Sequence, residues 1–266
     1  MSALSPRPSP IAVVPALLLV VISLWEVCVA RHDAASVPGD AAWHAAAERV
    51  RAGYRPGDLI VFAPAWVDPV GRRQLGDLIP LPVAARMDAA RYGRIWELAI
   101  RGARSPDTAG LEPAGVEEHG GVVVRRYERA PAIVVGDVLD RLATATTEGA
   151  RPTLELAEVG FAPHRCLQVN PAPGVPLRIR FPGFPLGTEL VGYAGIADVF
   201  TRRDVRSPGR LDVELAGKII ASVAPGVDDG WVRFAAATPP GAADVTFIVR
   251  ARDANRRICF AAEARQ

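Results

Sequence analysis

The sequence is poor in several features whose scarcity is informative. Lys218 is its single lysine, so arginine makes up almost all of the 31 basic residues, and 29 acidic residues nearly balance them. A net charge of +2 offers no clustered basic face of the kind that nucleic acid requires, so we expect no nucleic-acid partner. The arginine excess, with abundant alanine, glycine and proline, is typical of a GC-rich bacterial genome and indicates no phosphate-binding site.

The sequence also lacks complete catalytic and metal-binding motifs. None of its four histidines has another histidine, a cysteine or an acidic residue at a recognisable ligand spacing. It contains no glycine-rich phosphate loop and no G-x-S-x-G elbow. His164 lies two positions from Cys166, but such a pair on a strand is more often structural than nucleophilic. We therefore predict no catalytic residue, no metal and no cofactor, and we lean towards a protein that is not an enzyme.

Cysteine is rare, and its placement favours export. Cys28 falls in an apolar segment, which leaves Cys166 and Cys259 as a pair in the folded part. Exported proteins can oxidise such a pair to a disulfide. Because the two positions lie 93 residues apart (259 − 166), the bond would contribute about 4–5 kcal/mol in the chain-entropy model. The alternative is two buried free thiols.

Only one long apolar run is present, over residues 11–30. Twenty helical residues span about 30 Å, enough for the hydrocarbon core of a bilayer, so we predict a transmembrane signal-anchor. The alternative is a signal peptide cleaved after Ala30. Residues 1–10 would form a cytoplasmic head, and everything after the segment would be periplasmic. The protein would then cross a bacterial inner membrane once.

Residues 31–39 look like a tether, and residues 40–130 carry the pattern of a small α/β domain. Trp43 and Val50 lie on one face of a helix that starts near Asp40. The remaining elements that we predict are a buried strand over residues 59–63, a helix over 82–92, strands over 94–100 and 121–127, and a loop over 102–120.

The pattern changes after residue 152. Residues 131–152 are expected to connect the domains, with a short helix over residues 138–146. Residues 153–266 contain short β-rich runs at intervals of about ten residues, the spacing of a β-sandwich. The predicted fold class is therefore α+β and multidomain, with an N-terminal membrane helix, a small α/β domain and a jelly-roll-like C-terminal sandwich. Its first and last strands would run side by side and bring the two cysteines together.

Part of the α/β domain resembles a known family. The helix with Trp43 and Val50, the run PGDLIVFAP (residues 56–64) and the run YGRIWELAI (residues 92–100) are similar to the soluble extracytoplasmic tail of bacterial protein-mannosyltransferase-like membrane glycosyltransferases. The resemblance covers residues 43–127. That family keeps its acidic catalytic residues and its lipid-phosphate sugar donor in a multispanning part that this sequence does not contain. The resemblance therefore implies no catalytic residue here.

The C-terminal domain has a resemblance of its own. The runs LVGYAGIADVF (residues 190–200) and DDGWVRF (residues 228–234) are similar to the galactose-binding-type sandwiches found beside glycan enzymes. The resemblance implies carbohydrate binding, although sandwiches host many functions.

The segment after the first strand is the leading candidate for a ligand site. In open α/β sheets, ligands bind beyond the carboxyl ends of the strands. There Trp66 offers an aromatic face, Asp68 offers a carboxylate for sugar hydroxyls, and Arg72 and Arg73 offer charge for an anionic group. The alternative is that Trp66 packs in the core while the charged groups are solvated.

A second candidate is the turn that contains Asp228, Asp229 and Trp231. Its two carboxylates could join carbonyl groups around calcium, which takes six to eight oxygen ligands. A D-D-G sequence before a strand is more often a simple turn, with Trp231 packed inward.

These features favour a non-catalytic, membrane-anchored envelope protein that binds a glycan or assists a membrane glycosyltransferase. One alternative is a glycan-processing hydrolase or transferase whose carboxylate pair, such as Asp68 with a second acid, is assembled by the fold. The other alternative is a structural assembly partner, which would present an apolar patch.

Overall fold

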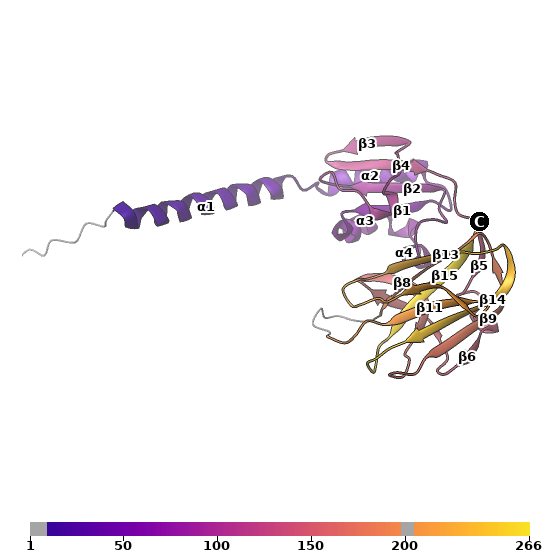
Figure 1. The fold of residues 1–266 in the computed structure, drawn as a ribbon. Helices are drawn as coiled ribbons and strands as arrows, with labels where there is room; N and C mark the ends of the chain where they lie inside the picture. Colours follow the sequence, from indigo (N-terminus) through magenta and orange to yellow (C-terminus); the bar gives the residue numbers. More distant parts are fainter. Residues whose placement is uncertain (1–9, 198–204) are drawn as a thin grey trace, which may run out of the picture.

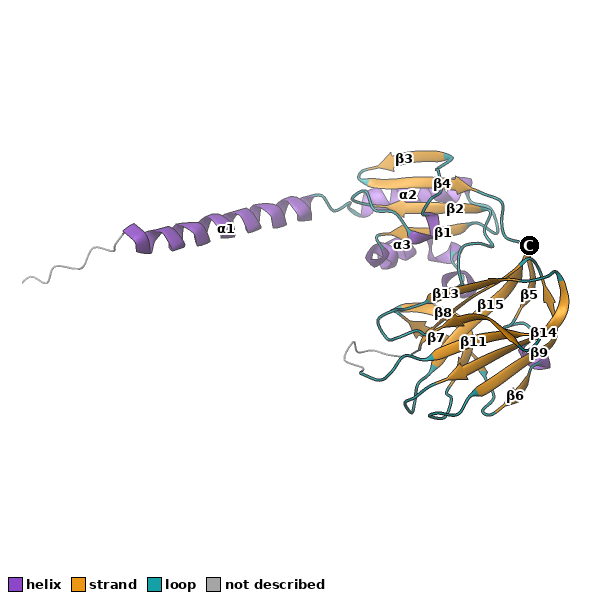
Figure 2. Cartoon of the chain, in the orientation of Figure 1, coloured by secondary structure: helices purple, strands orange, loops and turns teal. Residues whose placement is uncertain are grey.

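The computed structural model describes residues 10–197 and 205–266. It consists of one long N-terminal helix, a small α/β domain and a β-sandwich (Figures 1 and 2). This arrangement confirms the predicted fold class. The predicted cytoplasmic head lies outside the described residues except for Pro10, and so do residues 198–200 of the run that resembles galactose-binding sandwiches.

The N-terminal helix α1 (Pro10–Ala35) extends away from both domains (Figure 1). Its segment Val14–Ala34 has 21 residues, a mean hydropathy of 2.0 and no buried residue. Twenty-one helical residues rise about 31 Å, so by length and composition this helix can cross a membrane. The helix ends later than predicted because no proline or glycine interrupts it before Pro38. Only residues 36–39 therefore connect it to the next helix.

The α/β domain is built on a four-stranded sheet. Its elements are α2 (Asp40–Gly53), β1 (Leu59–Ala63), the 3-10 turn η1 (Ala65–Val67), α3 (Asp68–Leu75), η2 (Gly76–Leu78), α4 (Leu81–Ala84), β2 (Arg94–Ala99), η3 (Pro106–Thr108), β3 (Gly115–His119) and β4 (Val122–Glu128). The strand order is β1-β2-β4-β3, with β1 and β2 parallel and the other pairs antiparallel. The apolar face of α2, including Trp43 and Val50, is buried against this sheet, as the helical spacing predicts.

Two predictions in this domain are wrong. The helix predicted over residues 82–92 is limited to α4, and beyond it the chain turns. There the Asp88 carboxylate accepts a hydrogen bond from the Ala90 amide at 2.9 Å, a local bond that competes with helix formation. The loop predicted over residues 102–120 contains β3. This edge strand is exposed along almost its whole length, so its sequence carries no apolar alternation that would mark it as a strand.

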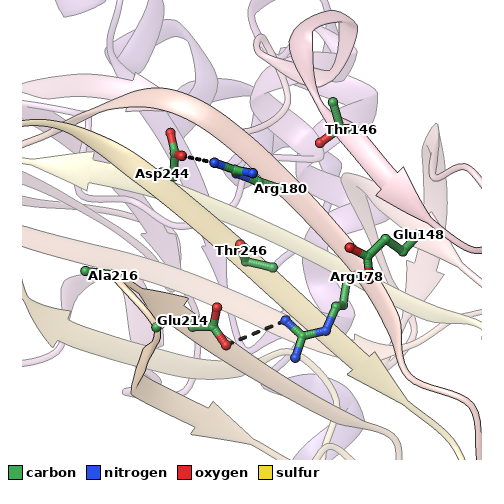
Figure 3. A pocket seen from close by; sticks show the side chains of 9 residues that line it. Thr146, Glu148, Arg178, Arg180, Glu214, Ala216, Asp244 and Thr246 are labelled. Atoms are coloured by element: carbon green, nitrogen blue, oxygen red, sulfur yellow. Dashed lines mark hydrogen bonds and ion pairs between the residues drawn. The ribbon is translucent and has the colours of Figure 1, made fainter.

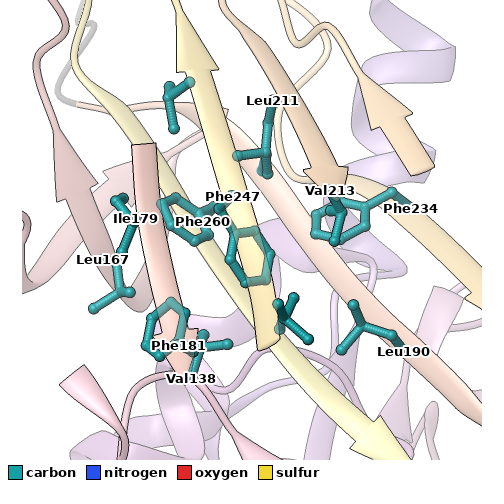
Figure 4. Close-up of a cluster of buried hydrophobic side chains, with 14 of the residues drawn as sticks. Val138, Leu167, Ile179, Phe181, Leu190, Leu211, Val213, Phe234, Phe247 and Phe260 are labelled. Carbon is teal, nitrogen blue, oxygen red and sulfur yellow. The ribbon is translucent and has the colours of Figure 1, made fainter. Parts of the chain in front are cut away.

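The sandwich consists of two antiparallel sheets. Its strands are β5 (Val134–Asp137), β6 (Thr146–Glu148), β7 (Thr153–Val159), β8 (Ala162–Val169), β9 (Leu177–Leu186), β10 (Glu189–Ile196), β11 (Arg210–Leu215), β12 (Lys218–Val223), β13 (Val232–Ala237), β14 (Gly241–Arg250) and β15 (Ile258–Arg265). One sheet has the order β13-β10-β15-β8-β7, with β5 also paired to β15, and the other has the order β12-β11-β14-β9-β6. Phe181, Phe247 and Phe260 lie at the centre of the core between them (Figure 4).

Residues 131–152, predicted as a connector, contribute to this sandwich. β5 pairs with β15, and β6 pairs with β9. The helix predicted over residues 138–146 is wrong, because only the 3-10 turn η4 (Leu142–Thr144) forms there. Val138 is buried in the sandwich core, which holds this segment against the sheets instead of leaving it free to coil.

The predicted disulfide between Cys166 and Cys259 is confirmed. Cys166 lies on β8 and Cys259 on the neighbouring strand β15, with their Cα atoms 5.6 Å apart. The last strand thus lies beside β8 and β5, and not beside β7, which was the first strand of the predicted sandwich. Cys28 is an exposed free cysteine in α1.

Residues 85–91, which we call the docking segment, fasten the α/β domain to the sandwich. The Arg165 amide of β8 donates to the carbonyl of Ala85 at 3.0 Å. The indole N–H of Trp231 donates to the carbonyl of Met87 at 3.1 Å. These carbonyls would be helical acceptors if the predicted helix continued, so docking replaces helical hydrogen bonds with contacts between the domains.

An ion-pair network completes this attachment. Arg91 in the docking segment pairs with Asp137 and, at 2.8 Å, with Glu263 of β15. Arg265, also of β15, pairs with Asp88 and with Glu263, each at 2.9 Å. Burial raises the pKa of Glu263, while both arginines favour its ionised form.

Candidate functional site

A groove of about 450 Å³ lies where the two domains meet. It is lined by the end of β1 and the start of α3, by the chain after α4 and after β2, and by the turn between β7 and β8. Three of the four residues in the leading predicted site, Trp66, Asp68 and Arg72, line it. The fourth, Arg73, does not.

Trp66 stands at the edge of the groove. It lies in η1, directly after β1, and its side chain is 61% exposed. The neighbouring Val67 is buried instead and holds the turn in the core of the domain. The alternative in which Trp66 packs in the core therefore does not describe this structure.

The charged residues after Trp66 lie on a helix, because residues 68–75 form α3. Asp68 and Arg72 are four residues apart and form an ion pair on one face of that helix. Arg73 points to the other side and pairs with Asp40 at the start of α2. The structure thus brings Asp68 and Arg72 to the groove and directs Arg73 to the contact between two helices.

Sequence reasoning missed the residues on the other sides of the groove. Arg86, in the docking segment, pairs with Asp107 of η3. Phe161 occupies the turn between β7 and β8 with a φ of 66°, and its side chain is 64% exposed. These residues are distant from Trp66 in the sequence, and no local pattern connects them. Only the packing of the sandwich against the docking segment brings them together.

A buried carboxylate fixes the chain after β2. Glu97 is fully buried and accepts hydrogen bonds from the Ser105 amide at 2.8 Å and from Arg125 at 2.7 Å. Arg104 lies 3.5 Å from the same carboxylate and over the ring of Tyr127. Burial, and then the neighbouring Glu97, raise the pKa of Tyr127. This network holds residues 104–107 in place beside the groove.

The fold gives the residues of the second predicted site different surroundings. Asp229 accepts a hydrogen bond from the Gly226 amide at 2.8 Å, as expected of a turn. Trp231 faces the docking segment and stacks on His164, with ring centroids 4.4 Å apart. Burial lowers the pKa of His164 to about 4. Among the described residues, no group of three or more histidine, cysteine, aspartate or glutamate side chains could hold a metal. Calcium binding by Asp228 and Asp229 together with carbonyl groups stays a prediction.

A separate depression of about 370 Å³ lies on the outer face of the sheet that contains β9 and β14 (Figure 3). Arg178 and Arg180 project there from β9, because alternate residues of a strand face the same side. Arg180 pairs with Asp244, and Arg178 lies 3.6 Å from Glu214. No aromatic side chain lines this depression, and both arginines are already paired. It is therefore a weaker candidate than the groove.

Comparisons with known proteins find similarity at the level of solved structures. No family model and no curated protein match the chain. It is similar to the module CsCBM6-3 from Clostridium stercorarium, solved in complex with cellobiose, with 9% identity and a TM-score of 0.30 over 46% of this chain and 87% of that chain. It is also similar to CBM51-2 and INT domains of ZmpB from Clostridium perfringens, in complex with GlcNAc, with 12% identity and a TM-score of 0.37 over 57% of this chain and 38% of that chain.

A third similar structure is the secreted serine protease VesC from Vibrio cholerae, with 8% identity and a TM-score of 0.32 over 65% of this chain and 43% of that chain. The ZmpB and VesC chains are thus much longer than the part that this chain spans. With TM-scores this low, none of these similarities identifies a ligand for the chain. The resemblance of residues 43–127 to glycosyltransferase tails stays a prediction.

Proposed function

We propose that this chain is a membrane-anchored envelope protein that binds a glycan in the groove between its domains. The observation that carries the proposal is the exposed indole of Trp66 beside two acid–arginine pairs in one groove. Ligand sites commonly combine an aromatic surface with a few fixed polar groups that set orientation.

The chemistry of the groove suits a sugar. The ring of Trp66 offers a flat apolar face on which the C–H face of a pyranose can lie. The pairs Asp68–Arg72 and Arg86–Asp107 present carboxylate acceptors beside guanidinium donors, a combination that matches hydroxyl groups, which both donate and accept. Because each charge has a partner within the protein, a neutral sugar can bind without leaving a charge uncompensated.

The compartment is part of the same proposal. A disulfide between Cys166 and Cys259 is stable in an oxidising space, and α1 can hold the chain in a membrane. We therefore place the folded part in the periplasm of a bacterium, anchored in the inner membrane. Cleavage after Ala30 would instead cut within α1 and release the folded part, which N-terminal sequencing of the mature protein would reveal.

A glycan-array screen of the full chain in lipid nanodiscs tests the binding proposal. We expect one class of glycan to bind, and Trp66→Ala to weaken that binding about tenfold or more, the effect of a central aromatic anchor. Ile133→Ala is the matched control, because Ile133 is exposed to a similar degree but does not line the groove. Binding that survives Trp66→Ala unchanged, or an array without any bound glycan, would contradict the proposal.

The groove favours binding over hydrolysis. A glycosidase needs two carboxyl groups, one of them protonated, on either side of the scissile bond. Asp68 and Asp107 both line the groove, but each is engaged by an arginine. Release of reducing sugar from a glycan that binds would establish the enzyme alternative.

One observation favours assembly with a partner as a second candidate function. Leu81 of α4 and Leu154 and Leu156 of β7 are exposed around an apolar pocket of about 340 Å³. β7 is an edge strand, whose unpaired side can accept a strand from a partner. If this surface binds a membrane glycosyltransferase, Leu156→Glu should abolish co-purification with that enzyme and Trp66→Ala should not. Equal loss with both variants would contradict a role of this surface.

A further inference from the structure

The anchor helix ends at the same edge of the sheet as the groove. Arg101 lies two residues after the end of β2 and donates a hydrogen bond at 2.8 Å to the carbonyl of Asp33 in α1. Trp66 follows β1, which is parallel to β2, so Trp66 and Arg101 both leave the sheet at its carboxyl edge. Figure 1 shows α1 departing from this side of the α/β domain.

The tether also packs against this edge. β3 and β4 are joined by a turn at Gly120 and Gly121, whose positive φ angles of 56° and 89° suit glycine. A Cβ atom on Gly121 would lie 3.3 Å from Pro38 of the tether, and one on Gly120 would lie 3.0 Å from Ala42 of α2. The connection between helix and domain is therefore short and in contact with the sheet edge.

These contacts set the distance between the domain and the membrane. The apolar segment of α1 ends at Ala34, and residues 36–39 can extend at most about 14 Å. The headgroup layer on each side of a bilayer is about 5–8 Å thick. If α1 spans the membrane, the carboxyl edge of β1 and β2 lies at or just above the headgroups.

The side chains at this edge suit such a position. Tryptophan is enriched at membrane interfaces because its ring is apolar and its N–H is polar. Trp66 is the exposed tryptophan of the folded part, whereas Trp43 and Trp96 are buried. Within residues 10–197 and 205–266, neither Arg31 nor Arg101 forms an ion pair with a carboxylate, so both can interact with anionic lipid.

We propose that the carboxyl edge of β1 and β2 rests on an anionic lipid surface, with Trp66 at headgroup depth and the groove opening at the membrane. The proposal rests on α1 spanning the bilayer, as proposed above, and needs no glycan. It adds a constraint on the ligand, because a glycan bound against Trp66 would be one that reaches the membrane surface, such as the head group of a glycolipid.

Fluorescence quenching in vesicles tests this arrangement. The full chain with Trp25→Phe, which removes the tryptophan of α1, is reconstituted in vesicles of phosphatidylcholine and phosphatidylglycerol. A nitroxide lipid labelled near the glycerol backbone serves as the shallow quencher. We expect it to quench part of the fluorescence, Trp66→Phe to remove most of that quenchable part, and Trp231→Phe to leave it.

Two outcomes would overturn the proposal. The first is a quenched fraction that is the same with and without Trp66→Phe. The second is quenching by a nitroxide at the end of the acyl chain that exceeds quenching by the shallow label, which would place the ring below the interface. Arg101→Gln should reduce the shallow quenching, and Arg178→Gln, on the outer face of the sandwich, should not. The quenching experiment contains no glycan. A negative quenching result therefore does not affect the glycan-array result, and an array without a bound glycan does not affect the quenching result.

Discussion

Aromatic and charged side chains differ in burial between the two sides of the junction between the domains. At the docking segment, the indole N–H of Trp231 donates a hydrogen bond to the carbonyl of Met87. Glu263 and Arg265 are buried there and form an ion pair with each other. At the groove, Trp66 and Phe161 expose most of their side chains. Folding depends on the first set, because buried polar groups without partners are costly. Trp66 lies at an exposed position and donates none of the described hydrogen bonds, so its ring can contact a ligand.

The disulfide should give the largest effect, because it lies beneath the docking side. Cys166 and Cys259 pack in a small cluster with Val159 and with Trp231 at its edge. Replacing both cysteines by alanine should lower the free energy of unfolding by about 4 kcal/mol, since the bond closes a long loop. Urea unfolding of the double variant measures this, and Cys28→Ala is the control. Equal unfolding midpoints for the double variant and the control would contradict this assignment.

The ion-pair network at the docking segment should give the next largest effect. Glu263→Ala would leave the buried Arg265 with one carboxylate partner fewer, and removing one member of a buried pair costs about 3 kcal/mol. The matched change at the groove, Asp68→Ala, breaks a pair that is about one third exposed and should cost less than about 1 kcal/mol. If chemical denaturation shows the same loss of unfolding free energy for Glu263→Ala and Asp68→Ala, the ion pairs on the two sides of the junction contribute equally, and this comparison is wrong.

The regular elements could be predicted from sequence because their patterns are local. The strand over residues 59–63 matches β1, since a short apolar run and the turn signals around it are readable. The helical spacing of Trp43 and Val50 likewise predicts α2. The edge strand β3 has no apolar alternation and gives no such signal.

The docking segment and half of the groove could not be predicted for the opposite reason. Residues 82–92 have a helical composition, but their backbone carbonyls bind Trp231 and Arg165 from the sandwich. Tertiary contacts of this kind override local propensity. The same docking brings Phe161 to the groove near Trp66, so the sequence indicated one side of the site and gave no signal for the other.

His164 should make the docking side sensitive to acid. Burial lowers its pKa to about 4, whereas the ordinary histidine pKa of 6.5 applies to the unfolded chain. Below pH 6.5 the unfolded state therefore binds a proton that the folded state does not, so stability falls as the pH falls towards 4. Between neutral pH and pH 5 the loss should be about 2 kcal/mol.

Denaturation over this pH range, compared between the wild type and His164→Phe, measures the effect of that histidine. Phenylalanine keeps a ring against Trp231 but cannot be protonated, so the acid-dependent part should shrink. His44→Gln, on the exposed face of α2, is the matched control for the replacement of a histidine. An identical pH dependence in the wild type and His164→Phe would exclude His164 as its source.

Replacing Trp66 should change stability least. A small change would indicate that the ring does not serve the fold. Trp66→Ala removes a ring that is 61% exposed and donates none of the described hydrogen bonds, so the free energy of unfolding should change by less than about 0.5 kcal/mol. Trp231→Ala is the matched change on the docking side. It removes the hydrogen bond to Met87 and the stacking on His164, so it should cost about 2 kcal/mol or more. Thermal unfolding of both variants compares the two sides directly. A large loss for Trp66→Ala would mean that this ring serves the fold, and its exposure would then be no argument for glycan binding.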